Sequence, residues 1–93
     1  LFMNELESLR VKIDEIDESI LELFSERFKV TQKVALVKKK HNLDAIDSSR
    51  EARQMEKIAK LSNKNKLNPE LMKKIFRLVI DDVVKNHKVV KTS

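Results

Sequence analysis

The chain has 93 residues, of which 38% are charged, and its formal net charge is +5. This length supports one small domain, so we predict a single domain over residues 1–93. The sequence contains no glycine and no cysteine, which excludes glycine-rich nucleotide loops, disulfides and thiolate metal sites. No apolar run approaches the roughly 18 residues that a membrane span needs. No signal peptide is visible. We therefore expect an all-α, cytoplasmic protein without membrane contact. The start at Leu1 rather than methionine indicates a processed chain or a piece of a longer one.

Apolar residues recur in steps of three and four along the first part of the chain, without an intervening glycine or proline. They are Leu6, Leu9, Ile13, Ile16, Ile20, Leu23, Val30, Val34 and Val37. This period predicts a helix over residues 4–40. Such a helix would measure roughly 50 Å, whereas a compact domain of this size has a radius of gyration near ~12 Å. Its apolar stripe would be exposed to water unless another chain covered it. We therefore predict an obligate homodimer with this helix at the interface.

Two shorter helices follow. In "DSSRE", residues 47–51, Ser48 and Glu51 have the spacing of a capping box, with Asp47 just ahead, which predicts the start of a second helix. That helix fades in the polar run 62–66, which we interpret as a turn. Asn68 as N-cap and Pro69 in the first turn predict the start of a third helix, which frays near the chain end. The predicted fold class is all-α, with three helices per chain and a very long first helix.

The few arginines are the better candidates for a specific site, because a guanidinium can grip a carboxylate through two parallel hydrogen bonds. Arg27 falls in the series of the apolar stripe, and Lys38 follows it by eleven residues, about three helical turns. Both long side chains would then lie on one face, roughly 16 Å apart at their Cα atoms, with room for a small dianion between them. Arg10 lies too far along the same helix, roughly 25 Å from Arg27, and could reach this pocket only from an antiparallel partner chain.

His87 extends the apolar face of the third helix, four residues after Val83. Each of these polar residues also has a purely structural interpretation. An arginine in an apolar seam often pairs with a glutamate, a lone lysine is usually solvated, and a histidine such as His87 is often only a buried residue with its hydrogen bonds satisfied. The S-x-x-E pattern is usually only a helix cap. The functional interpretation depends on these residues converging in one place.

The sequence resembles the all-helical, type II family of chorismate mutases. The matching segments are "LRVKIDEIDESILELFSER" (9–27), "VALVKKKHNL" (34–43), "DSSRE" (47–51) and "IFRLVIDDVV" (75–84). Together they cover nearly the whole chain, and their combination is more specific than any segment alone. The resemblance implies an intertwined homodimer with two active sites.

Four cations are implied in substrate binding. Arg27 and Arg10 of the partner subunit would bind the substrate carboxylates, and Arg50 would lie on the second-helix side of the pocket. Lys38 would donate a hydrogen bond to the ether oxygen of the breaking bond. Catalysis would rest on Arg27, Lys38 and His87.

The remaining implied positions are acidic or depart from the family pattern. Asp47 and Glu51 match groups near the ring hydroxyl of the substrate. Val83 stands where the family often has a small polar residue, so one polar contact is missing there. His87 stands where a glutamine or glutamate usually supplies the second donor to the ether oxygen, a role that a ring nitrogen can fill.

The implied reaction is the pericyclic rearrangement of chorismate to prephenate in aromatic amino acid biosynthesis, with no cofactor and no metal. Two related alternatives are an isochorismate pyruvate-lyase-like enzyme on the same scaffold and a non-catalytic regulatory domain that binds similar ligands. The positive charge and "KKKH" also suggest a nucleic-acid-binding or coiled-coil module. We do not expect nucleic acid as a partner, because the aromatic residues are all phenylalanines, mainly on apolar faces, and form no stacking platform.

Overall fold

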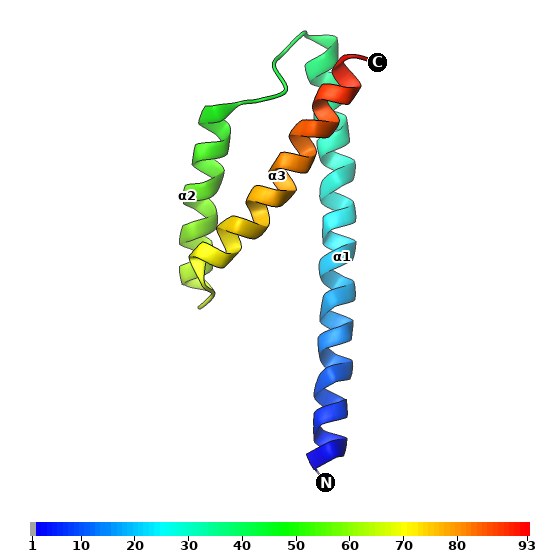
Figure 1. Cartoon of the computed structure of the whole chain (residues 1–93), viewed down its shortest axis with the longest axis vertical. Helices are drawn as coiled ribbons and strands as arrows, with labels where there is room; N and C mark the ends of the chain where they lie inside the picture. Colours follow the sequence, from blue (N-terminus) through cyan, green and yellow to red (C-terminus); the bar gives the residue numbers. More distant parts are fainter. Residues whose placement is uncertain (1) are drawn as a thin grey trace. The chain divides into compact units, whose positions relative to one another are not determined.

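The computed structural model describes residues 2–93 and consists of three helices (Figure 1). They are α1 (Phe2–Lys40), α2 (Ser48–Lys64) and α3 (Pro69–Lys91), and residues 2–93 contain no strand. The all-helical fold class is therefore confirmed. The start of α1 at Phe2 is two residues earlier than predicted, and α3 ends at Lys91, near the chain end as predicted.

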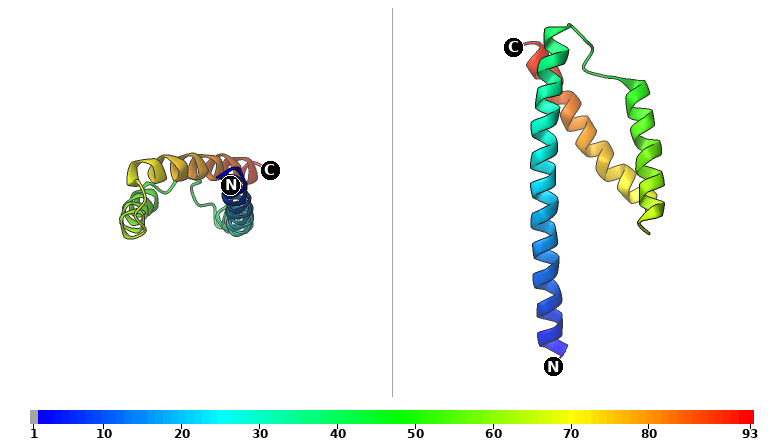
Figure 2. Two further views of the ribbon diagram at one scale, coloured as in Figure 1. Left: turned by 90° about the horizontal axis from the view of Figure 1, so that it is seen from below. Right: turned by 180° about the vertical axis from the view of Figure 1, so that it is seen from behind.

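The helix α1 is a single unbroken element, as the right view of Figure 2 shows. No glycine or proline interrupts it, and Lys38, Lys39 and Lys40 in its last turn complement the negative end of the helix dipole. It ends in a Schellman motif, in which Leu43 N–H donates to the Lys38 carbonyl at 2.8 Å. Asn42 takes the left-handed conformation that this motif needs, with φ 53°.

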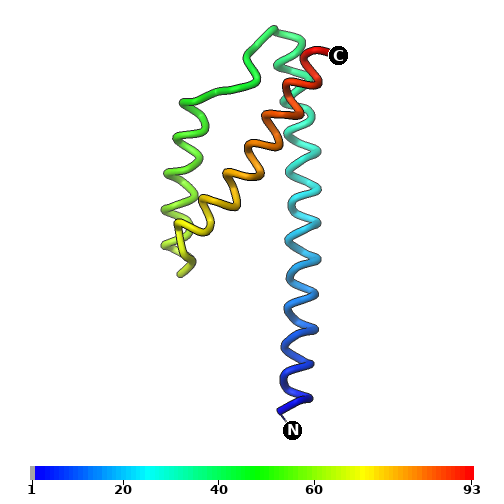
Figure 3. The backbone as a smooth tube through the Cα atoms, in the orientation of Figure 1, coloured from blue at the N-terminus to red at the C-terminus, as the bar shows by residue number. Residues whose placement is uncertain are grey.

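The connection from α1 to α2 is a short loop over residues 41–47 (Figure 3). Its last residue, Asp47, is the N-cap of α2, and its Oδ1 accepts a hydrogen bond from Arg50 N–H at 3.0 Å. The cap therefore lies one residue earlier than the capping-box spacing of Ser48 and Glu51 predicts. Asp47 competes well for this role because a carboxylate also complements the positive end of the helix dipole.

The helix α2 ends in a Schellman motif, as α1 does. Lys66 is left-handed with φ 58°, and Leu67 N–H donates to the Ser62 carbonyl at 2.8 Å. Asn68 then caps α3 by accepting from Glu70 N–H and Leu71 N–H, and Pro69 occupies the first helical position. This start agrees with the sequence prediction. The two helices pack against each other beyond the turn (Figure 1).

The contacts divide the chain into two compact units, with Thr31 at the end of the first and Gln32 at the start of the second. The second unit holds the small core, in which Ala35, Ala45, Ile80 and Val83 are buried. His87 and Ser62 are the buried polar residues of the described chain, and Ser62 Oγ donates to the Ile58 carbonyl at 2.6 Å within its own helix. The prediction of a single domain stays a prediction.

The described residues of the first unit all belong to α1, and their apolar side chains are largely exposed in the single chain. Ile13, Ile16 and Leu23, for example, are 55%, 58% and 63% exposed. The apolar stripe of this helix is therefore exposed to water in the single chain, as the predicted helix length implies.

Within the described residues, no helix combines the length and the apolar character that crossing a bilayer requires.

Candidate active site

The ammonium group of Lys38 lies at the end of α1, where two other segments of the second unit meet it. Its Nζ donates to the Ala45 carbonyl at 3.1 Å and lies 3.4 Å from Nδ1 of His87. Lys38 is half-buried, so these contacts are partly shielded from water. The structure thus brings together Lys38 and His87, which are 49 residues apart in the chain.

His87 is buried, with 4% of its surface exposed, on the face of α3 that also carries Val83. A lysine ammonium has three donors and no acceptor. A hydrogen bond between the two groups therefore requires Nδ1 to accept, which assigns the ring proton of a neutral His87 to Nε2. The buried neighbour Val83 presents an apolar wall one helical turn earlier.

A second polar link joins α1 to α3 close to His87. Asn86 Nδ2 donates to Oε1 of Gln32 at 2.7 Å. Because Asn86 directly precedes His87, this bond helps to fix the rotation of α3 at the histidine.

The first turn of α2 carries three of the predicted site residues. Asp47 is exposed and uses one oxygen for the cap, and Arg50 is exposed as well. Glu51 is half-buried, and its backbone N–H donates to the Asp47 carbonyl at 3.0 Å, as in a regular helix start.

Arg77 of α3 holds the side chain of Glu51, a contact that sequence reasoning missed. Its Nη2 lies 2.6 Å from Glu51 Oε1, and its Nε donates to Asp81 Oδ1 at 3.0 Å. The hydrogen bond to Glu51 is the main cause that raises the pKa of Arg77, and burial opposes it. The spacing of Arg77 and Asp81, one helical turn, was visible in the sequence. The pairing with Glu51, 26 residues away, was not.

Arg10 and Arg27 lie in the first unit. Arg10 is exposed, and Arg27 is half-buried. Their approach to Lys38 or to a second chain stays a prediction from helical spacing.

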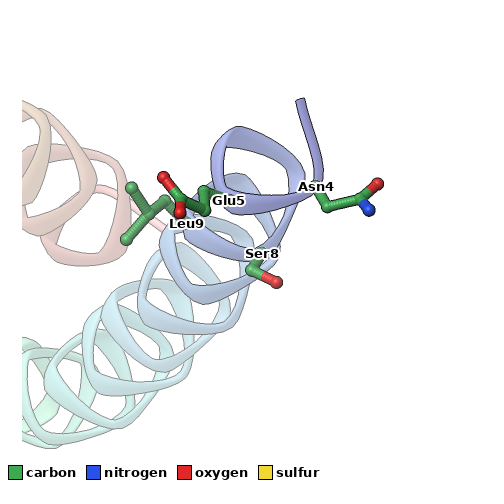
Figure 4. A pocket seen from close by; sticks show the side chains of 4 residues that line it. All are labelled: Asn4, Glu5, Ser8 and Leu9. Carbon is green, nitrogen blue, oxygen red and sulfur yellow. The ribbon is translucent and has the colours of Figure 1, made fainter. Parts of the chain in front are cut away.

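The first turns of α1 bear a shallow surface hollow bordered by Asn4, Glu5, Ser8 and Leu9 (Figure 4). All four residues are near neighbours on one helix. Asn4 and Ser8 point away from Glu5 and Leu9. The side chains do not converge, so this hollow is not a candidate for the site.

Comparison with known families identifies the protein family whose fold carries Lys38, His87 and the start of α2. The model of the chorismate mutase type II family matches residues 9–88. The chain belongs to this family. All four segments on which the resemblance was based lie within the matched range, and the predicted family is confirmed.

Several curated proteins are similar to this chorismate mutase type II chain. A bifunctional chorismate mutase/prephenate dehydratase of Buchnera aphidicola subsp. Schizaphis graminum is 35% identical over 85 residues, which cover 91% of this chain and 22% of that protein. A protein of the same name from Aquifex aeolicus is 34% identical, over 98% of this chain and 26% of its own length. A chorismate mutase of Methanocaldococcus jannaschii is 33% identical, over 85% of this chain and 80% of its own length. The chain thus spans about a quarter of the bifunctional relatives and most of the archaeal one.

Proposed function

We propose that this chain is a chorismate mutase that converts chorismate to prephenate in aromatic amino acid biosynthesis. The family match over residues 9–88 supports the reaction class. The reaction is an intramolecular rearrangement, in which a C–O bond breaks while a C–C bond forms, and it requires neither a covalent intermediate nor a proton transfer. The protein would act by holding a flexible dianion in a reactive conformation and by stabilising the charge that develops on the ether oxygen.

The observation that carries this proposal is the convergence of Lys38 and His87. Their nitrogen atoms come from different helices and lie 3.4 Å apart in a half-buried setting. Ala45 and His87 engage two of the three N–H donors of Lys38, which leaves the third, among the contacts of residues 2–93, for a ligand. The family resemblance assigns the second donor to the ring of His87. Two fixed donors aimed at one oxygen are the arrangement that lowers the barrier of such a step.

The carboxylates of the dianion would be bound by arginines. Arg27 shares a helix face with Lys38 by its spacing of eleven residues, and its planar guanidinium suits a carboxylate. Arg10 of the partner subunit would complete the pocket, and Arg50 at the exposed start of α2 would contribute from its own side.

The ring hydroxyl of the substrate would meet the acidic residues at the start of α2. Asp47 already uses Oδ1 for the helix cap, so only Oδ2 would serve the ligand. Glu51 is the better placed acceptor because its side chain is only 18% exposed. Val83 would contribute shape rather than a hydrogen bond.

The proposed assembly is an intertwined homodimer. The exposed apolar stripe of α1 supports it, because an apolar surface of this length is stabilised when a second chain removes it from water. The cytoplasmic location also stays a proposal.

The test is direct. Purified protein is incubated with chorismate, and both chorismate loss and prephenate formation are followed. We expect equal molar amounts of the two, without an added cofactor. Ligand binding without turnover would contradict the proposal and indicate a regulatory domain. Release of pyruvate from isochorismate, with chorismate left unchanged, would contradict it in favour of the lyase.

A further inference from the structure

Arg77 joins two carboxylates that belong to different helices. Its Nη2 lies 2.6 Å from Glu51 Oε1 on α2 and 2.8 Å from Asp81 Oδ1 on α3. The side chain of Asp81 is 62% exposed, whereas that of Glu51 is only 18% exposed. The two carboxylates are therefore unequal: that of Asp81 lies toward solvent, and that of Glu51 is largely shielded from water.

Asp81 fixes the guanidinium plane from one side. Both Nε and Nη2 of Arg77 contact the same oxygen, Asp81 Oδ1, and the two residues are one helical turn apart. A guanidinium held by two of its nitrogens has little rotational freedom left. It can therefore impose a position on the Glu51 carboxylate that it contacts.

The charge of Glu51 is the reason why this position matters. The proposed substrate is a dianion, and an unpaired carboxylate next to it would repel it. Arg77 shares its positive charge between Glu51 and Asp81, and it offsets part of the charge of Glu51 while Oε2 of Glu51 can still accept a hydrogen bond.

We propose that Arg77 is a positioning residue for Glu51: it holds the Glu51 carboxylate and offsets part of its charge, so that Glu51 accepts the substrate hydroxyl with less repulsion of the dianion. This inference rests on the proposed function. Arg77 itself would not touch the substrate.

The central variant is Arg77→Gln, which removes the positive charge and keeps a side chain of similar shape. We expect KM for chorismate to rise about five- to tenfold, in the range of a lost charge-assisted contact, while kcat changes less than twofold. The rise should shrink with added salt, because salt screens the repulsion. Adding Glu51→Gln to Arg77→Gln should reverse most of the rise in KM, since the uncompensated charge is then gone. A merely structural role of Arg77 predicts no such reversal.

The matched control is Arg53→Gln, which removes the same charge from an exposed residue of α2. It should leave KM within about twofold, as surface charges of this kind contribute little. Equal KM values for Arg77→Gln and Arg53→Gln, or a double variant no better than Arg77→Gln, would overturn the inference while wild-type turnover upholds the proposed function. Absence of turnover in the wild type would overturn both. Should Arg77→Gln not fold by circular dichroism, Arg77→Lys, which retains the charge, carries the test: KM within about threefold of wild type supports the role, and a rise beyond tenfold refutes it.

Discussion

Lys38 connects three segments of the candidate site through one ammonium group. It belongs to the last turn of α1, donates to Ala45 in the following loop, and meets His87 of α3. A lysine is a point charge whose donors can be directed separately, so it can serve two protein acceptors and one ligand at the same time. Its role as a donor to the reacting oxygen stays a proposal.

The first prediction concerns the loss of this donor. In Lys38→Ala we expect kcat to fall by roughly 10²–10³, the loss typical of one donor that stabilises charge in the transition state. Steady-state kinetics with chorismate measure it. Lys39→Ala is the matched control, because Lys39 donates to the carbonyl of Ser93 and not to the site. Similar turnover in both variants would refute the role of Lys38.

The second prediction concerns the proton on His87. A second proton on the ring would occupy Nδ1, which could then no longer accept from Lys38, and it would place two positive charges side by side. Histidine is the side chain whose charge ordinarily changes between pH 5 and 8. We therefore expect kcat/KM to fall on the acidic side in the wild type and to stay flat in His87→Gln, measured from pH 5 to 9. Superimposable profiles would contradict this assignment.

The sequence allows a prediction of individual site residues where the helical period places them on one face of a helix. It singled out Lys38 and His87 on separate helices, although their contact spans 49 residues. It did not assign any role to Arg77, because an arginine on α3 is visible locally only through its neighbour Asp81. Pairing with Glu51 depends on how α2 packs on α3, and no local pattern encodes that packing.

At the scale of the elements, both α1 and α2 end without glycine. Asn42 and Lys66 take left-handed conformations at the two helix ends, with φ 53° and 58°. Asparagine tolerates this region better than most residues, whereas a lysine there bears a steric cost of about 1–2 kcal/mol because its Cβ approaches the following carbonyl. The turn before α3 is therefore formed at the expense of local strain.

The third prediction follows from that strain. Lys66→Gly should raise the free energy of unfolding by about 0.5–1 kcal/mol, since the relief of the left-handed conformation exceeds the added chain entropy of glycine. Urea denaturation measures the change. Asn42→Gly is the comparison and should gain less. A destabilised Lys66→Gly protein would show that the lysine side chain contributes a contact larger than the backbone strain.

The helix boundaries show what a single sequence can and cannot define. The starts of α2 and α3 follow from capping residues, and the start of α3 at Asn68 and Pro69 agrees with the prediction. For α2, "DSS" offers several side chains that can cap, and the backbone selects Asp47 rather than Ser48. The capping free energies of adjacent candidates differ by less than the packing free energy of the helix. The local pattern therefore defines this boundary only to within one residue.

At the scale of the whole molecule, the long first helix is the feature that sequence length and periodicity predict best. The apolar stripe along it is exposed, as expected for a single chain. The residues that cover this stripe in the proposed dimer belong to a second chain, so the helical period of one chain does not identify them.

The fourth prediction tests that covering. Sedimentation equilibrium should give a dimer for the wild type and a monomer for Ile16→Lys, in which a charge stands on the stripe at a residue that is 58% exposed in the single chain. Glu18→Lys is the matched control, because helical spacing places Glu18 on the opposite face. A monomeric wild type, or a dimeric Ile16→Lys, would contradict the proposed interface.

The proposed dimer would also make catalysis depend on the protein concentration. If Arg10 completes a pocket on the second chain, an isolated chain has no complete site, and turnover per chain depends on the fraction that is associated. By mass action, the rate rises in proportion to protein at high concentration and with the square of protein well below the dissociation constant. Chorismate would raise the associated fraction in turn, because the proposed pocket is complete only in the paired form. The substrate of this protein would thus help to assemble its own catalyst.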